Sequence, residues 1–278
     1  MARFYQTMDM PTMMITTIHK WRLMASFFCL AIPQAFAAQN VAVAPASANA
    51  SASAATVNVA SKTAVVADFQ AFTAQYQIFR SGKKHGEASR YLKKDGAGYE
   101  LGYNSKISWL VFKDERKERS KFVIEQGRVK PLHYLMQRSG TGPSRHYELS
   151  LDWEQKQLKT EKKQVVKQVV WNEQWLDMLS FHSQIVLDIQ QGKTDFVYDV
   201  LNRHGENRIY KYKVATEEWL SLPYGKVKAI RIERYGHGPD KQVYAWLAPE
   251  LNYLLVRLWQ SEDDVEQFDV QLSEYQPD

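Results

Sequence analysis

Residues 147–153, Tyr-Glu-Leu-Ser-Leu-Asp-Trp, decide the fold class of this chain. Four apolar residues stand at strict spacing two in this segment: Tyr147, Leu149, Leu151 and Trp153. Because successive side chains of a strand point to opposite faces, the spacing predicts a β-strand with one dry and one wet face. Antiparallel sheets that cover a core on one side are built from such strands.

The same alternation recurs before and after this segment, so the chain predicts many strands. Glycine-bounded turns at 82–86 and 95–98 separate the first strands, and Gln126-Gly127 forms another turn. Residues 253–259 are nearly continuous in apolar side chains, which predicts a more buried strand. These features together predict a meander of antiparallel strands. The alternating sets are Tyr99, Leu101 and Tyr103; Leu132, Tyr134 and Met136; Tyr210, Tyr212 and Val214; and Phe268, Val270 and Leu272.

One segment departs from the period of two. Its apolar residues recur at spacings of three and four, which is the period of a helix face. Asp177 precedes the pattern as a candidate N-cap, and Gly192 follows it as a candidate C′ residue. We therefore predict one amphipathic helix over about residues 178–191, packed on the sheet. The residues that set the period are Met178, Phe181, Ile185 and Ile189.

The predicted fold is mainly β: a large curved antiparallel sheet, either a half-barrel or a barrel-like meander, with the helix at 178–191. The sequence shows no alternation of strands and helices, which is the pattern that would predict a parallel sheet. A closed barrel and an open half-barrel give the same alternation, so the sequence leaves both open. Residues 66–278 contain no second low-complexity break and are predicted to form a single β-rich domain.

The first 37 residues predict a secretory signal peptide. A short apolar run at 24–32 follows Lys20 and Arg22, and a small-x-small cleavage signal ends at Ala37. The run is too short to span a bilayer, which takes about 20 residues, so no transmembrane anchor is expected. We therefore expect a periplasmic protein cleaved near Ala37. Cys29, the single cysteine of the chain, leaves with the signal, so the mature chain has no disulfide.

Composition limits the partners. Residues 38–65 are mostly Ala, Ser, Val, Asn and Thr, and predict a disordered tether. The formal net charge of the whole chain is +5, and removal of residues 1–37 lowers it to +3. This mild charge and the predicted export argue against nucleic-acid, ATP-driven and NAD-linked roles. The charged run at 113–119 mixes both signs and is interpreted as a solvated strand face rather than a polyanion site.

The chain contains no motif typical of a catalytic or metal site. There is no Gly-x-Ser-x-Gly nucleophile elbow and no mature cysteine. The histidines of the folded part have no second histidine at helical or hairpin spacing, so no metal and no cofactor are expected. His182 is interpreted as a packing residue of the helix. These histidines are His85, His133, His146, His182, His204 and His237.

The last third of the chain carries a recognisable pattern. Residues 210–214 (Tyr-Lys-Tyr-Lys-Val) precede 222–234, which begin Leu-Pro-Tyr-Gly-Lys-Val, and 246–257 read Trp-Leu-Ala-Pro-Glu-Leu-Asn-Tyr-Leu-Leu-Val-Arg. With Gly-Glu-Ala at 86–88 and the strand at 118–122, this pattern resembles the bacterial envelope family known as domain of unknown function 3108. The resemblance covers about residues 70–275. It implies fold and compartment, and no established activity can be transferred from it.

The same pattern supplies the candidate ligand residues. Pro249 cannot donate a ladder hydrogen bond, so the strand from Val243 is expected to end there and to form a hairpin with the next one. The hairpin can be purely structural, or its tip can form a ligand site, and the sequence leaves both interpretations open. The candidate ligand-binding residues are Trp246, Glu250 and Tyr253.

Three function classes follow. The first is a non-catalytic periplasmic carrier for an apolar envelope ligand, a lipid or acyl chain, held between a curved sheet and its helix. The second is an interaction or scaffold protein in envelope assembly, with a lipid or an envelope protein as partner. The third is a hydrolase of envelope polymers, which ranks last because no motif supports it. The sequence leaves the oligomeric state open.

Overall fold

The computed structural model of the protein describes residues 69–278 except 162, 168, 237 and 239. The predicted signal peptide at 1–37, the predicted tether at 38–65 and His237 lie outside the described residues. The described part is dominated by strands and contains one α-helix, α1 (Phe181–Gln190). No helix of this part is long and apolar enough to cross a membrane.

Fifteen strands form one continuous sheet. One edge strand is β8, and from it the order descends to β1 in the middle of the sheet. There β1 pairs with β15, and the order descends again from β15 to β9 at the other edge. The strands are β1 (Phe72–Arg80), β2 (Lys83–Asp95), β3 (Gly98–Trp109), β4 (Phe112–Glu125), β5 (Arg128–Gly140), β6 (Arg145–Asp152), β7 (Gln157–Thr160), β8 (Lys163–Lys167), β9 (Trp175–Asp177), β10 (Asp195–Leu201), β11 (Asn207–Leu222), β12 (Gly225–Tyr235), β13 (Lys241–Ala248), β14 (Leu254–Glu262) and β15 (Val265–Pro277).

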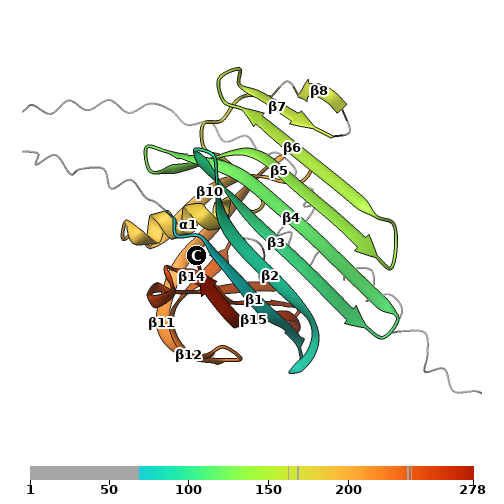
Figure 1. The fold of residues 1–278 in the computed structure, drawn as a ribbon, viewed down its shortest axis with the longest axis vertical. Coiled ribbons are helices and arrows are strands. Elements are labelled where there is room, and N and C mark those ends of the chain that lie inside the picture. Colours follow the sequence, from blue (N-terminus) through green and yellow to red (C-terminus); the bar gives the residue numbers. More distant parts are fainter. Residues whose placement is uncertain (1–68, 162, 168, 237, 239) are drawn as a thin grey trace, which may run out of the picture. The chain divides into compact units, whose positions relative to one another are not determined.

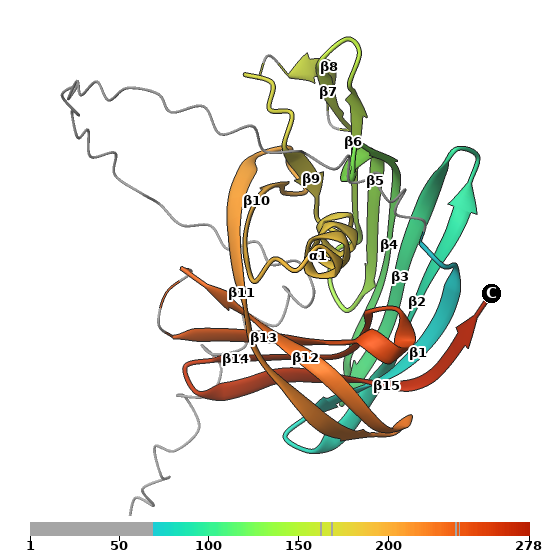
Figure 2. The ribbon, with the colours of Figure 1, turned by 90° about the vertical axis from the view of Figure 1, so that its left-hand side faces the viewer.

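The sheet is curved and open. Its two edges are β8 and β9, which do not pair with each other in the described part of the chain. Figures 1 and 2 show the strands curving around α1, which lies on the concave side between β3–β5 and β10–β11. The prediction of a curved antiparallel sheet with one helix is confirmed, and the open half-barrel is the form observed.

One expectation about the strands is wrong. The pair β9 and β10 is parallel, and α1 connects these two strands. Parallel strands need a crossover connection, and a helix is the usual one. The sequence did not predict this unit because β9 contains only three residues, Trp175–Asp177, too few to show an alternation.

Most of the alternating residues are buried as predicted, but Leu132 is 39% exposed because the β4–β5 register shifts beside it. Leu149 is fully buried and pairs with Tyr134, another fully buried side chain. The strand predicted at 253–259 is β14, where buried Leu254 and Val256 alternate with half-exposed neighbours. The prediction of a more buried strand is confirmed, since no residue of β14 is exposed, although one of its faces is covered only in part.

The helix is shorter than predicted at its start. It begins at Phe181 with Ser180 in the N-cap position, rather than at 178 with Asp177 as the cap. Its end matches the prediction, since Gly192 adopts φ +81° directly after the C-cap residue Gln191. A residue in this left-handed conformation is the common end of a helix, and glycine accepts it at the lowest cost.

Candidate functional site

The charged run at 113–119 forms most of β4, and alternate residues of that strand face the concave interior. Arg116 and Glu118 are only 2% and 3% exposed, whereas Lys117 and Arg119 are exposed on the opposite face. The interpretation of the run as a solvated face is therefore wrong for half of its residues. The period-two rule, applied to Arg116, Glu118 and buried Ser120, would have identified this inward row.

Five residues form what we call the interior polar cluster: Arg90 on β2, Arg116 and Glu118 on β4, Tyr134 on β5 and His182 on α1. The Tyr134 hydroxyl donates to Glu118 Oε2 at 2.7 Å, and Arg116 Nη1 lies 3.5 Å from Glu118 Oε1. Arg90 Nη2 lies 3.4 Å from His182 Nδ1. The cluster therefore joins the concave face of the sheet to the first turn of the helix.

Strand register explains why these residues meet. Arg90 is opposite Tyr103 in the β2–β3 pair, and Tyr103 is opposite Glu118 in the β3–β4 pair. Residues directly opposite each other in neighbouring strands point to the same face of the sheet. Three residues far apart in sequence thus form one row across the interior.

Asp177 fixes the start of the helix above this row. Its Oδ1 accepts the backbone N–H groups of Leu179 and Ser180, and its Oδ2 accepts the Ser120 hydroxyl at 2.6 Å. The carboxylate is fully buried and ties β9 and α1 to β4. Asp177 is thus a capping residue, as the sequence suggested, although it caps the turn before the helix.

The cluster contains more cationic than anionic groups. Two guanidinium groups, those of Arg90 and Arg116, face the single carboxylate of Glu118, because the Asp177 carboxylate is occupied by Ser120 and the turn. Burial lowers the pKa of Arg90 and raises the pKa of Glu118, since desolvation disfavours both charged forms. Burial also holds the pKa of His182 well below its ordinary value, with a further contribution from the Arg90 charge, which favours a neutral imidazole.

Donor groups in this interior lack protein acceptors. Arg90 is 6% exposed, and its Nε has no hydrogen-bond partner among the described residues; the same holds for the hydroxyl of buried Tyr212 on β11. Phe181 of α1 stacks on Tyr212, with ring centroids 6.0 Å apart. Since buried polar groups are nearly always paired, these donors mark a place that can receive acceptor oxygens.

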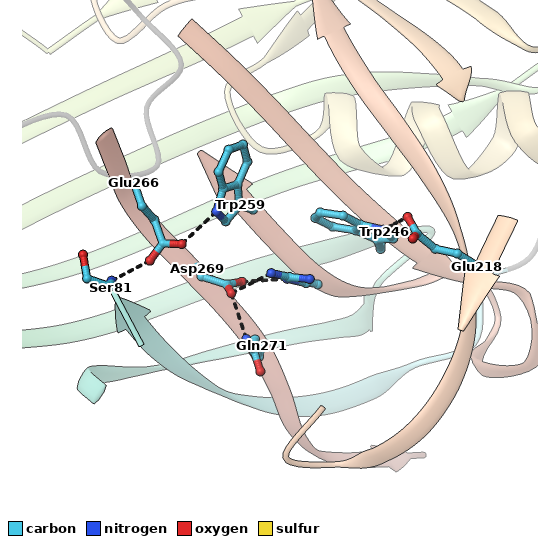
Figure 3. Close-up of polar contacts among 8 residues, drawn as sticks. Ser81, Glu218, Trp246, Trp259, Glu266, Asp269 and Gln271 are labelled. Atoms are coloured by element: carbon cyan, nitrogen blue, oxygen red, sulfur yellow. Dashed lines mark hydrogen bonds and ion pairs between the residues drawn. The ribbon is translucent and has the colours of Figure 1, made fainter. Parts of the chain in front are cut away.

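The other face of the sheet carries a second ordered group, which we call the outer aromatic ladder: Tyr244, Trp246, Arg257 and Trp259 on β13 and β14. The Arg257 guanidinium lies 4.8 Å from the Trp246 ring centroid, and the Tyr244 and Trp259 rings stack at 5.3 Å. Figure 3 shows the Trp246 indole directed at Glu218 and the Trp259 indole at Glu266; the two hydrogen bonds measure 2.9 Å each.

The ladder continues onto β15 through a bidentate pair. Arg257 Nε and Nη2 each donate to the Asp269 carboxylate at 2.8 Å, and Gln271 also donates to it, as drawn in Figure 3. Such cross-strand pairs stabilise an antiparallel sheet. The ring faces and both indole N–H groups are occupied within the protein, so the ladder is organised as a structural element.

The structure does not join the three ligand-binding candidates predicted from sequence. Trp246 belongs to the ladder, and it is 5% exposed. Glu250 is exposed on the short 3-10 helix η2 (Pro249–Leu251), directly after β13 ends, as Pro249 predicted. Tyr253 adopts φ +58° in the turn that follows, and its N–H donates to the Ala248 carbonyl. The hairpin interpretation is confirmed, and no hydrogen bond in the described residues links the three side chains.

The described histidines are scattered, and no three His, Cys, Asp or Glu residues of the described part converge as metal ligands would. His133 lies 2.6 Å from Glu148, and His85 and His204 contact Trp109 and Tyr147. An open groove of about 500 Å³ is lined by Lys84, Asn104 and Lys106 among others. Most of its lining residues are polar or charged, and it is open to solvent, so it differs from the enclosed apolar cavity that the carrier hypothesis predicts.

These features define a class of protein: an open, strongly curved antiparallel sheet around one helix, with a polar cluster in a mainly apolar interior. The chain belongs to the family of proteins of unknown function DUF3108, which matches residues 72–272. The family resemblance of the sequence is thereby confirmed. No curated protein matches the chain significantly.

A solved structure of another family shows related architecture. A β-barrel-like protein of the domain of unknown function DUF1849 from Brucella abortus superposes with a TM-score of 0.51 at 9% identity, over 75% of this chain and 98% of that chain. A predicted lipoprotein from Parabacteroides distasonis is similar with a TM-score of 0.29 at 10% identity, over 75% and 96% of the two chains. At these identities the likeness concerns the fold alone.

Proposed function

We propose that this protein is a non-catalytic binding or carrier protein of the bacterial periplasm, and that its interior takes an amphiphilic envelope ligand. The ligand class is a lipid or acyl chain that carries an anionic group. The observation that supports the proposal best is Arg90, a buried guanidinium that faces the interior with a donor not used by the described protein groups. The predicted signal at 1–37 supports the compartment.

The charge balance favours an anionic ligand group. A buried charge is costly unless it is paired, and here two guanidinium groups share one carboxylate. A carboxylate or phosphate placed beside Arg90 would neutralise the excess and accept charge-assisted hydrogen bonds. Such bonds are among the stronger ones in proteins.

The surrounding walls favour an apolar ligand body. Around the cluster, the concave face carries aromatic and aliphatic side chains from both halves of the sheet. Tyr76 and Ile78 of β1 lie on one side, and Ile232 of β12 and Val270 of β15 continue the same face. An apolar wall with few polar groups is typical of small-molecule sites.

The contacts of the cluster support binding rather than catalysis. Glu118 Oε2 accepts the Tyr134 hydroxyl, Oε1 lies 3.5 Å from Arg116, and burial lowers the pKa of His182 beside Arg90. A general base needs a nucleophile or a substrate proton within hydrogen-bond reach. Among the described residues, the hydroxyl that contacts Glu118 is that of Tyr134, which donates to Oε2, and His182 contacts Arg90. The proposal therefore includes no chemical step.

A matched pair of ligands tests the proposal. Delipidated protein is titrated with oleate and with oleyl alcohol, and binding is followed by intrinsic fluorescence and calorimetry. The wild type is expected to bind oleate at least about tenfold more tightly, since charged hydrogen bonds contribute about 1.5–3 kcal/mol. Arg90→Met should abolish this preference, whereas Arg119→Met, on the exposed face of β4, should retain it.

Two outcomes would contradict the proposal. Equal affinity for the acid and the alcohol would remove the role of Arg90, and failure to bind either ligand would remove the carrier role. The second result would favour the alternative, an interaction or scaffold protein in envelope assembly, and capture of envelope partners would follow.

A further inference from the structure

The hairpin between β3 and β4 ends in four apolar residues, Trp109, Leu110, Val111 and Phe112, which we call the apolar tip. Leu110 and Val111 are each 80% exposed, and Phe112 is 39% exposed. Trp109 and Phe112 are opposite each other in the last pair of the ladder. Figure 1 shows this hairpin end at the free margin of the sheet, at the lower right, without another element over it.

The turn itself does not require these residues. Leu110 adopts φ +53°, a conformation that glycine, asparagine or aspartate accepts at lower cost than leucine. Other tight turns of the same sheet use Ser81-Gly82, Gln126-Gly127 and Asp263-Asp264 at positive φ. The apolar tip thus combines unfavourable exposure with an unfavourable backbone, so folding alone does not account for it.

Cationic side chains surround the tip. The Arg80 guanidinium lies 5.1 Å from the Trp109 ring centroid, and His85 contacts the same ring. Lys83, Lys106 and Lys113 are exposed nearby and form no ion pair among the described residues. We call Arg80, Lys83, Lys106 and Lys113 the basic rim.

The acidic residues of this region are largely neutralised. Glu87 pairs with Lys84 at 2.8 Å, and Asp114 pairs with Arg138 at 2.7 Å. Glu115 lies opposite Lys106 in the β3–β4 pair and offsets one lysine of the basic rim, whereas the acidic turn at 262–264 belongs to the β14–β15 hairpin, two strands beyond β2. The immediate surroundings of the tip are therefore positive.

We propose that the apolar tip inserts into the interfacial layer of an anionic lipid membrane while the basic rim contacts the headgroups. An apolar tip of this size gives only marginal membrane binding alone, and a second, electrostatic signal makes the attachment useful. Each cation near an anionic membrane surface adds about fivefold in affinity. A convex tip of four residues is small for a stable protein interface, which takes about 800 Å² from each partner.

The proposal goes beyond the carrier function and does not depend on it. Attachment through the tip would hold the domain at a membrane whatever ligand its interior takes. The two inferences rest on different residues, so they can fail separately.

Sedimentation with vesicles tests the membrane inference. The mature protein is mixed with phosphatidylcholine vesicles, with or without phosphatidylglycerol, and the bound fraction is measured at low and high salt. The wild type should bind the anionic vesicles at least about fivefold better, and salt should weaken the binding. The double variant L110N/V111N should lose most of it, and K83Q/K106Q/K113Q should lose the dependence on anionic lipid.

Control variants keep the result interpretable. Asparagine accepts the positive φ of residue 110, so L110N/V111N should keep the wild-type circular dichroism spectrum and Tm. Val197→Asn removes a 59% exposed valine from β10 and should leave vesicle binding unchanged. Wild-type protein that fails to bind anionic vesicles, or binding that L110N/V111N does not reduce, would overturn the inference; the former would favour a protein partner for the tip.

Discussion

At the scale of single residues, the interior polar cluster is the unusual feature of this protein. Buried arginines normally face a full set of carboxylates and carbonyls, whereas Arg90 contacts His182 and forms no ion pair among the described residues. Residues kept for binding often reduce the stability of the ligand-free fold. Stability measurements can therefore separate a binding role for Arg90 from a structural one.

Arg90→Met should not destabilise the delipidated protein. Replacing buried charge by an apolar side chain of similar volume is often neutral, or stabilising by about 1–4 kcal/mol. Urea unfolding of the wild type and the variant, both free of ligand, measures the change. A loss of more than about 2 kcal/mol would assign Arg90 to the structural framework.

Glu118→Gln should have the opposite effect. It removes the carboxylate that lies 3.5 Å from Arg116, and breaking a buried ion pair costs about 3–5 kcal/mol. Glu115→Gln lies on the exposed face of the same strand and should change the free energy of unfolding by less than about 0.5 kcal/mol. Similar free energies of unfolding for the two variants in urea titrations would show that Glu118 contributes no more to stability than the exposed Glu115.

His182 should make stability depend on pH. Its pKa is depressed in the folded protein, so the unfolded chain binds more protons below the ordinary imidazole pKa of about 6.5. The stability contributed by neutral His182 is therefore present above that pH and is lost as the pH falls. Burial raises the pKa of Glu118 and Asp177, which gives the opposite slope because raised carboxyl pKa values cost stability as the pH rises.

Comparison with His182→Gln isolates the histidine from these carboxyl groups. Between pH 7.5 and pH 5.5 the wild type should lose more stability than the variant, as measured by urea unfolding at each pH. Parallel profiles for the two proteins would show that His182 does not titrate in this way.

At the scale of elements, the sequence predicted most of the strands and the helix because their packing is periodic. The helix start was misplaced because Met178 and Leu179 continue its apolar pattern, while the backbone there follows the Asp177 turn. The unit β9–α1–β10 was not predicted because its first strand is too short for a pattern. Contacts across the interior, such as Ser120 with Asp177, depend on tertiary structure that no local spacing reveals.

The helix should contribute strongly to stability through its sheet-facing side. Leu187 is 1% exposed, so Leu187→Ala should lower the free energy of unfolding by about 2–5 kcal/mol. Gln190→Ala, at an exposed position of the same helix, is the matched control and should have little effect. A small loss for Leu187→Ala in urea unfolding would indicate that the helix is loosely held on the sheet.

At the scale of the whole molecule, two meanders joined by the β1–β15 pair form one curved sheet around α1. Alternation along the strands predicted this sheet, and the resemblance of residues 210–257 to a known family identified the family. The candidate site was not predicted, because Trp246, Glu250 and Tyr253 were chosen from the family pattern rather than from a shared face. A residue belongs to the inward row of β4, or to the apolar tip, according to the face and the end of the sheet at which it lies.

The central claim is that this interior carries an anionic amphiphile, and native mass spectrometry tests it most directly. The full-length precursor is expressed in a bacterium, and the exported protein is purified under mild conditions and measured in native and denaturing solution. We predict a bound mass that matches an acidic lipid, that disappears on denaturation and that is absent from Arg90→Met. A ligand-free mass in repeated preparations, or an equal load on Arg90→Met, would contradict the account.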